Sequence, residues 1–179
     1  MAEGFERLDA ETKWEGRIVS ARIERWRHAD GEEVEREVVS HQGAVAVVAH
    51  DDEHVWLVRQ PREPVNDPAL LELPAGKLDV EDEEPLETAQ RELAEEVGKS
   101  AASWRELDAF YTSPGFSDER VVVYLATELL DAEAQAGENE RIEVVPWPLD
   151  RLDEAIDACE DAKSLVGLLW LRALRAGRG

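Results

Sequence analysis

Cysteine is almost absent from this chain, because Cys159 is the only one in 179 residues. A single cysteine cannot form an intrachain disulfide, which is typical of proteins that work in a reducing cytoplasm. We expect Cys159 to be buried or half-buried near a helix. No apolar run approaches the roughly 18 residues of a membrane span, and the acidic residues 1–6 lack the apolar segment of a secretory signal. The sequence therefore predicts a cytoplasmic protein without a membrane span.

Positive charge is also scarce. Lysine and arginine together number 20 against 42 aspartates and glutamates, so the formal net charge is -22 at pH 7. This balance argues strongly against nucleic acid or an anionic membrane surface as a partner, because like charges repel. Acid-rich, lysine-poor surfaces are typical of proteins that work in concentrated salt, which screens such repulsion. We therefore predict a halophilic protein, in which most carboxylates are solvated surface groups.

The pattern of apolar residues predicts an α+β domain with a mixed sheet and helices packed on it. Strands are expected at residues 14–27, 34–40, 43–49, 54–59, 70–73, 104–112, 121–127 and 142–147. Helices are expected at residues 85–97, 149–159 and 163–176. The Asp-Gly pair at Asp30 favours a hairpin turn in the N-terminal β region, residues 1–42. Residues 43–179 form the rest of the same unit, and their first strand is apolar enough to be buried on both faces.

Three carboxylates share one side of the helix expected at residues 85–97. Glu92, Glu95 and Glu96 are spaced i, i+3 and i+4, so they lie one turn apart. Like charges so placed repel each other, and a hard divalent cation such as Mg²⁺ converts that cost into a binding site. Glu83, near the start of the helix, can approach the same metal. Taken alone, these acids also fit a solvated helix in an acidic protein.

The wider spacing resolves this ambiguity. From Gly76 to Lys99 the sequence reads GKLDVEDEEPLETAQRELAEEVGK. It resembles the Nudix box, G-x5-E-x7-R-E-U-x-E-E-x-G-U, in which U is apolar. Seven residues separate Glu83 from Arg91, as the box requires, but six rather than five separate Gly76 from Glu83. That insertion falls in a loop, where extra length is tolerated. Lys99 replaces the last apolar residue, so we expect altered packing after the helix and unaltered chemistry.

The resemblance implies a Nudix-type α/β/α sandwich with a mixed sheet, preceded by the N-terminal β-hairpin region. It implies a hydrolase that splits a nucleoside diphosphate linked to another moiety, with Mg²⁺ as cofactor and Mn²⁺ as an alternative. The implied metal ligands are the carboxylates of Glu83, Glu92, Glu95 and Glu96 and the main-chain carbonyl of Ala75. Arg91 is implied to hold and orient the carboxylate of Glu95.

Residues 58–77 resemble the ADP-ribose pyrophosphatase branch of this family. They offer Arg59 and Arg62 as phosphate or ribose contacts and Glu72 as a further substrate contact. A surface salt bridge for each arginine, and an ordinary strand-end charge for Glu72, are the alternatives. The branch usually carries an aromatic residue where this chain has Pro61, so base stacking from this loop is not expected.

Two later segments extend that resemblance. Pro114 stands about 16 residues past the box, a position associated in the family with ADP-ribose preference, although Pro-Gly alone signals only a turn. Pro114 and Gly115 are therefore candidate substrate contacts. In residues 136–144 the family's acidic loop supplies the catalytic base, for which Glu138 is the first candidate and Glu140 the second.

The N-terminal hairpin completes the expected site. In the ADP-ribose branch this region crosses a homodimer interface and helps to enclose adenine, which makes Trp26 a candidate substrate contact; core packing is the alternative. The expected reaction is hydrolysis of ADP-ribose to AMP and ribose 5-phosphate. Another nucleoside diphosphate sugar, such as GDP-mannose, is the alternative substrate. A non-catalytic ADP-ribose sensor is disfavoured, because every box carboxylate is present.

Overall fold

The computed structural model describes residues 4–132 and 141–177. The chain divides into two compact units. The first contains the N-terminal strands up to Gly43 together with Tyr111–Arg120, and the second contains Ala44–Phe110 and the chain from Val121 onward. That Tyr111–Arg120 groups with the N-terminal strands was not indicated by the sequence.

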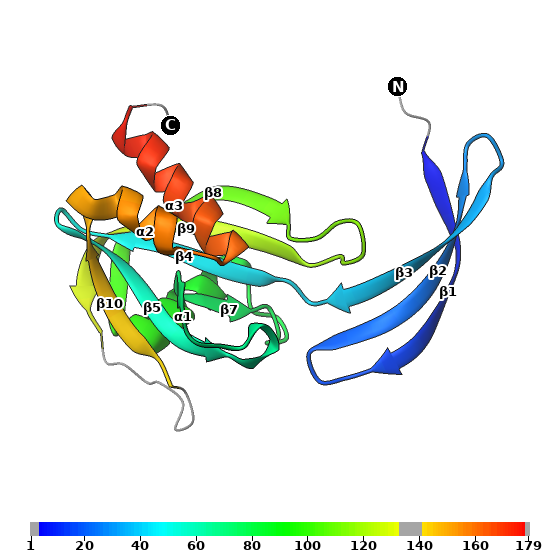
Figure 1. The fold of residues 1–179 in the computed structure, drawn as a ribbon, viewed down its shortest axis with the longest axis horizontal. Helices are drawn as coiled ribbons and strands as arrows, with labels where there is room; N and C mark the ends of the chain where they lie inside the picture. The colour runs from blue at the N-terminus through cyan, green and yellow to red at the C-terminus, as the bar shows by residue number, and fades with distance from the viewer. Residues whose placement is uncertain (1–3, 133–140, 178–179) are drawn as a thin grey trace. The chain divides into compact units, whose positions relative to one another are not determined.

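The first unit is a three-stranded antiparallel sheet, drawn in blue in Figure 1. Its strands are β1 (Phe5–Glu15), β2 (Val19–His28) and β3 (Glu33–His41). The β2–β3 turn contains Gly31 at a φ of 90°, which confirms the predicted Asp-Gly hairpin. The strand predicted at residues 14–27 is confirmed from Val19 onward as β2, but residues 14 and 15 end β1, because the chain reverses where the Gly16 N–H donates to the Val19 carbonyl at 2.9 Å. β1 is almost wholly exposed and carries no apolar period, so its sequence gives little strand signal.

The second unit is built on a mixed seven-stranded sheet. The strand order is β10 (Glu143–Pro148), β5 (His54–Arg62), β4 (Ala44–His50), β9 (Arg120–Asp131) and β8 (Lys99–Tyr111). Two short strands lie off this path: β6 (Asp67–Glu72) pairs with β5, and β7 (Ala75–Lys77) pairs with β4. β4 and β9 run parallel, whereas β5 pairs antiparallel with β4, β6 and β10, and β7 pairs antiparallel with β4.

Helices cover both faces of this sheet (Figure 1). They are α1 (Pro85–Val97), α2 (Leu152–Ala158) and α3 (Ala162–Arg175). The central strand β4 is buried from Ala44 to Ala49, as predicted, and its alternate side chains face opposite sides. Val48 packs in a cluster with Leu168 of α3, whereas Val47 packs with Leu93 of α1. This is the α/β/α sandwich that the sequence led us to expect.

Several elements begin or end at residues other than those predicted. β5 continues through Pro61, where the register shifts between Gln60 and Arg62, because a bulge tolerates a residue without an N–H. β6 begins at Asp67 and includes Pro68, which an edge strand accommodates. The helix predicted at residues 149–159 begins as a 3-10 turn, Leu149–Arg151, and becomes α-helical only at α2. Among the described helices, none is long and apolar enough to cross a bilayer.

Cys159 follows the end of α2 and is buried, as predicted. Its thiol Sγ lies 3.5 Å from the Leu71 carbonyl, to which it donates. Burial raises the pKa of this thiol above its ordinary value, because the charged thiolate is poorly solvated there.

Candidate active site

Helix α1 carries most of the predicted metal ligands. It starts with Pro85 in its first turn and a hydrogen bond from the Glu84 N–H to the Glu87 carboxylate at 3.0 Å, and it ends at Gly98 with a φ of 70°. Its apolar face, which includes Leu93, packs against the sheet. The remaining faces therefore present the acidic residues of the box.

Arg91 gathers three carboxylates around one guanidinium. Its Nε and Nη2 donate to the two oxygens of Glu83, each at 3.1 Å. Its Nη1 donates to Glu92 at 2.8 Å and to Glu95 at 3.0 Å. The predicted Arg91–Glu95 pair is therefore present, and Arg91 also pairs with Glu83 and Glu92. Hydrogen bonding to Glu83 and the charge of Glu92 raise the pKa of Arg91, while burial opposes that rise.

Glu83 is fixed from two sides. Arg91 is the larger influence, and the Thr88 hydroxyl also donates to Glu83 at 2.8 Å. Both interactions favour the charged carboxylate and lower the pKa of Glu83 below its ordinary value, although burial opposes them. Thr88 is fully buried and was missed by the sequence analysis. Its spacing was the available signal, because residues three apart, such as Thr88 and Arg91, share a helix face.

Glu96 lies against the segment that enters β7. Its Oε2 accepts the main-chain N–H of Ala75 at 2.9 Å, and the residue is only 9% exposed. Ala75 is held opposite Ala46 of β4 by strand pairing. The contact between Glu96 and Ala75 uses the Ala75 N–H, whereas the predicted metal ligand is the Ala75 carbonyl. The structure thus brings these two predicted site residues together and leaves that carbonyl role a prediction.

The motif begins with glycine because Gly76 lies directly against the side chain of Glu92. A Cβ built on Gly76 would lie 2.0 Å from Oε1 of Glu92 and 2.1 Å from its Cδ. No side chain fits in that space unless the Glu92 carboxylate moves. The glycine therefore lets β7 approach α1 closely enough for Glu92 to lie directly against the main chain.

The chemistry of this cluster fits a divalent cation. Three carboxylates surround one guanidinium and a fourth, that of Glu96, lies on the same helix. Carboxylate oxygens are the ligands that Mg²⁺ and related hard cations prefer. Over the described ranges, no three acidic, histidine or cysteine side chains are already arranged as a metal cage. Glu92 and Glu95 instead point to Arg91, which keeps carboxylates close together that would otherwise repel each other.

The predicted base candidates, Glu138 and Glu140, lie outside the described residues. Their role as general base remains a prediction.

Among the predicted substrate residues of β5 and β6, Arg62 and Glu72 pair with each other, whereas Arg59 contacts the main chain. Arg62 pairs with both oxygens of Glu72, at 2.6 and 2.8 Å, and hydrogen bonding to Glu72 raises the pKa of Arg62. The Glu72 side chain is completely buried and also pairs with Lys163 of α3 at 2.6 Å. The alternative of an ordinary strand-end charge for Glu72 is therefore wrong. Arg59 lies at the surface, where its Nη1 donates to the Ala69 carbonyl at 3.1 Å.

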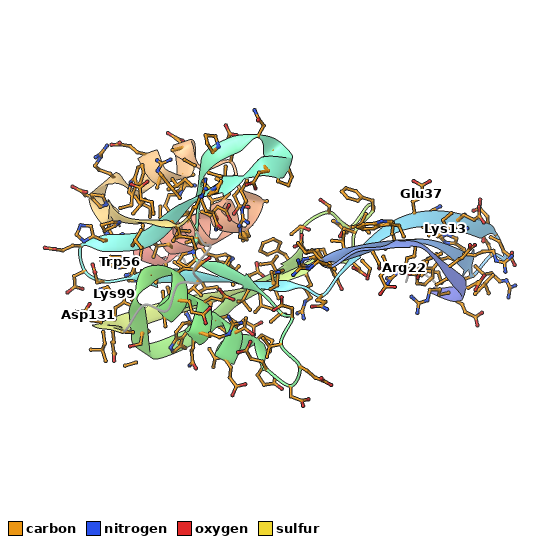
Figure 2. All side chains as sticks on the ribbon, turned by 90° about the horizontal axis from the view of Figure 1, so that it is seen from below. Lys13, Arg22, Glu37, Trp56, Lys99 and Asp131 are labelled. Carbon is orange, nitrogen blue, oxygen red and sulfur yellow. The ribbon has the colours of Figure 1, made fainter. Side chains whose placement is uncertain are left out.

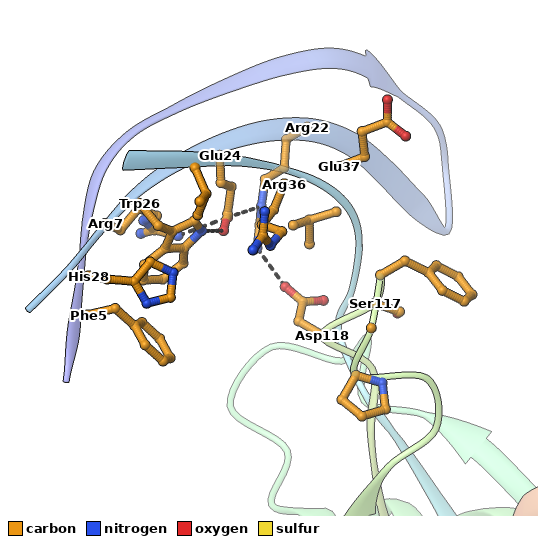
Figure 3. A pocket seen from close by; sticks show the side chains of 15 residues that line it. Phe5, Arg7, Arg22, Glu24, Trp26, His28, Arg36, Glu37, Ser117 and Asp118 are labelled. Carbon is orange, nitrogen blue, oxygen red and sulfur yellow. Dashed lines mark hydrogen bonds and ion pairs between the residues drawn. The ribbon is translucent and has the colours of Figure 1, made fainter. Parts of the chain in front are cut away.

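The first unit contains a pocket of about 530 Å³ (Figure 3). Trp26, Pro114 and Gly115 all line it, so three predicted substrate residues from distant segments meet there. Trp26 is half-buried and packs edge-to-face with Phe5, with ring centroids 5.3 Å apart. Arg7 lies over the same indole, 5.9 Å from its centroid.

A buried carboxylate organises the wall of this pocket (Figure 3). Glu24 is 3% exposed and accepts hydrogen bonds from Arg7 at 3.1 Å, from Arg22 at 2.6 Å and from the Trp26 indole at 3.1 Å. These bonds fix the Trp26 ring. Arg22 also pairs with Asp118 at 2.6 Å, which ties the Tyr111–Arg120 segment to β2.

Lys99 occupies the last position of the box, where the motif has an apolar residue. It makes a cation–π contact and an ion pair in place of apolar packing. Its Nζ lies 4.5 Å from the centroid of the Trp56 ring and 2.6 Å from Asp131 (Figure 2). A cation over an indole face contributes favourable electrostatic energy, and the lysine stem covers apolar surface. The altered packing expected after α1 is therefore a cation–π contact on β5.

Comparison with known proteins identifies the family. A family model described as NUDIX domain matches residues 40–166. An ADP-ribose pyrophosphatase from Mycobacterium tuberculosis (strain ATCC 25618 / H37Rv) is 46% identical over 183 residues, covering 99% of this chain and 88% of that protein. An ADP-ribose pyrophosphatase from Bacillus subtilis (strain 168) is 39% identical over 166 residues, covering 90% and 89%. A solved structure titled as that of an ADP compounds hydrolase has a TM-score of 0.85 at 22% identity, covering 100% and 98%, and so shares the fold. This chain belongs to the NUDIX domain family.

Proposed function

We propose that this protein is a Nudix hydrolase that uses Mg²⁺ to split ADP-ribose into AMP and ribose 5-phosphate. The observation that carries this proposal is the Arg91 cluster of Glu83, Glu92 and Glu95, with Glu96 alongside at Ala75. The choice of ADP-ribose is supported by similarity to two ADP-ribose pyrophosphatases over most of their lengths.

The reaction requires charge neutralisation at the pyrophosphate. Its oxygens repel an incoming nucleophile, and a bound divalent cation would neutralise them and favour in-line attack by water. Glu92, Glu95 and Glu96, with the carbonyl of Ala75, are the proposed ligands. Arg91 keeps Glu92 and Glu95 close to each other, and Glu83 in turn orients Arg91 through two hydrogen bonds.

A carboxylate completes the chemistry by accepting the proton of the attacking water. Glu138 is the first candidate and Glu140 the second. As the bond from the water oxygen to one phosphorus forms, the bond from that phosphorus to the bridging oxygen breaks, and the bridging oxygen leaves with the other phosphate. One phosphate therefore stays on adenosine as AMP and the other stays on ribose as ribose 5-phosphate.

Substrate recognition is assigned to two groups of residues. Arg59 and Arg62 supply positive charge for phosphate or ribose, and buried Glu72 holds Arg62 in a fixed orientation. The pocket lined by Trp26, Pro114 and Gly115 offers an aromatic face of the kind that adenine stacks on.

We further propose a cytoplasmic homodimer that tolerates concentrated salt. Large apolar side chains on the first unit support a subunit interface, since Phe5, Trp14 and Ile18 are each more than half exposed. The net charge of -22 supports the salt tolerance.

The test is an assay of purified protein with ADP-ribose in molar KCl, with and without Mg²⁺, followed by phosphorus NMR and chromatography. AMP and ribose 5-phosphate should appear only with metal. GDP-mannose in parallel reactions measures selectivity, and we expect slower turnover. Folded protein that cleaves GDP-mannose and leaves ADP-ribose intact would contradict the substrate assignment.

A further inference from the structure

Two successive residues at the start of helix α3 contact the last residue of β6, Glu72, and the residue that follows it, Leu73. Lys163 pairs with the buried carboxylate of Glu72 at 2.6 Å. The next residue of the helix, Ser164, accepts the main-chain N–H of Leu73 at 2.7 Å through its hydroxyl oxygen. Ser164 and Leu73 are both completely buried. Because water does not reach this N–H, the serine is its partner for hydrogen bonding.

Asp161 fixes the orientation of that hydroxyl. As the residue that caps α3, it accepts the Ser164 main-chain N–H at 3.0 Å. The same carboxylate oxygen accepts the Ser164 hydroxyl at 2.5 Å. A serine hydroxyl has one hydrogen and two lone pairs. With its hydrogen directed to Asp161, its lone pairs remain available to the Leu73 N–H.

Close packing of α3 restricts the same residue further. A Cβ built on Gly167 would lie 2.5 Å from Cδ1 of Leu73 and 2.8 Å from Cγ2 of Val48. The glycine therefore allows the helix to lie directly on the Leu73 side chain. Leu73 is held through its main chain by Ser164 and through its side chain by this contact.

The main chain from Leu73 leads directly to the proposed metal site. The Pro74 carbonyl accepts the Val47 N–H at 2.8 Å, and the Ala75 N–H donates to Glu96 at 2.9 Å. Three successive residues are thus fixed in turn by α3, β4 and α1. A displacement of Leu73 would move Ala75 relative to Glu96, because a peptide chain held at 74 has little slack over two residues.

We infer that Ser164, oriented by Asp161, is a positioning residue that fixes Leu73–Ala75 against Glu96 and thereby sets the affinity of the site for its divalent cation. The inference rests on the proposed function for its metal site, but not for its substrate.

The test compares Ser164→Ala with wild type in binding of Mn²⁺, measured by electron paramagnetic resonance without nucleotide. We expect the dissociation constant to rise about 10-fold, the lower end of what loss of an outer-shell partner costs a metal site. Amide hydrogen exchange at Leu73 and Ala75, the two residues of this segment that carry an N–H, should accelerate. In turnover, the Mg²⁺ concentration for half-maximal rate should rise by a similar factor, whereas KM for ADP-ribose at saturating Mg²⁺ should change less than about twofold.

Two further variants separate positioning from general stability. Asp161→Ala keeps the Ser164 hydroxyl but removes both its orienting partner and the cap of α3, so we expect a lower Tm together with a smaller weakening of Mn²⁺ binding in the same direction. Leu171→Ala is the control, because it removes buried packing from the same helix and leaves the Leu73 hydrogen bond in place. It should lower the Tm with little change in Mn²⁺ affinity.

Wild-type Mn²⁺ affinity in folded Ser164→Ala would overturn the inference, as would equal weakening in Leu171→Ala. Absence of Mn²⁺ binding by the wild-type protein would overturn it together with the proposed metal site. Wild-type protein that binds Mn²⁺ but does not cleave ADP-ribose would overturn only the substrate assignment. The inference would then stand on the binding difference between Ser164→Ala and wild type.

Discussion

At the residue scale, Glu96 combines a proposed role as a metal ligand with a hydrogen bond to the main chain. Its carboxylate accepts the Ala75 N–H and is proposed to bind the cation. A glutamine at this position keeps an oxygen that can accept the same N–H, but it loses the negative charge. Glu96→Gln therefore separates the two roles within one side chain.

We expect Glu96→Gln to reduce kcat at least about 100-fold, the loss typical of removing one charge-stabilising group from an active site. The Tm should remain close to wild type, because the hydrogen bond to Ala75 is retained. Steady-state kinetics and thermal unfolding of the same preparation test both statements. Glu53→Gln is the matched control, since Glu53 is an exposed acid of the β4–β5 turn and should keep full activity. Wild-type turnover in folded Glu96→Gln would contradict the ligand assignment.

The contacts of single residues were only partly predictable. The spacing of the box placed Arg91 beside Glu95 because a helix fixes the separation of residues four apart. The sharing of Arg91 with Glu83 was not predicted, since it depends on the path of the loop before α1. Ser164 could not be connected to Leu73 for a similar reason: a hydrogen bond between residues 91 positions apart depends on tertiary packing, which leaves no local pattern.

At the element scale, the start of α1 couples its stability to the ionisation of Glu83. Arg91 and Thr88 lower the pKa of Glu83 in the folded protein below its ordinary value. A carboxyl group whose pKa is lower in the folded state stabilises that state above its unfolded pKa. This contribution disappears as the pH falls through the folded pKa.

We therefore expect wild-type protein to be more stable than Glu83→Gln at pH 7, with a difference that shrinks below about pH 4.5, near the ordinary pKa of glutamate. Urea unfolding of both proteins across this pH range, with a chelator present, measures the difference. Low protein concentration is needed because the sequence pI is about 4.4. A difference that stays constant from pH 7 to pH 3 would show that the Glu83–Arg91 interaction does not contribute in this way.

Elements with a clear apolar period were the ones that the sequence predicted well. α1 has the predicted bounds, because Pro85 and Gly98 mark its ends and a buried stripe marks its face. The unbroken apolar run of β4 likewise predicted a central strand. β1 was missed since it is exposed along almost its whole length, and its strand structure comes from pairing with β2.

At the scale of the whole molecule, the net charge of -22 opposes compaction in dilute buffer. The Debye length falls from about 30 Å at 0.01 M salt to about 3 Å at 1 M, so molar salt screens most of this repulsion.

We predict that the Tm rises between dilute buffer and molar KCl, by several degrees, the shift expected for each kcal/mol gained. NaCl at the same ionic strength should give a similar rise, because screening depends on ionic strength and not on the identity of the cation. Calorimetry with both salts makes the comparison. A Tm that is flat or falling with KCl would count against the halophilic assignment.

The lone thiol at the end of α2 provides this protein with a native reporter of local opening. Cys159 is buried, its pKa is raised, and its Sγ contacts the Leu71 carbonyl, so a thiol-reactive dye cannot attack it in the closed state. Labelling therefore requires that the segment joining α2 to α3, which contains Cys159, moves away from β6. Since the chain has no other cysteine, the labelling rate measures how often that layer opens, without an engineered probe.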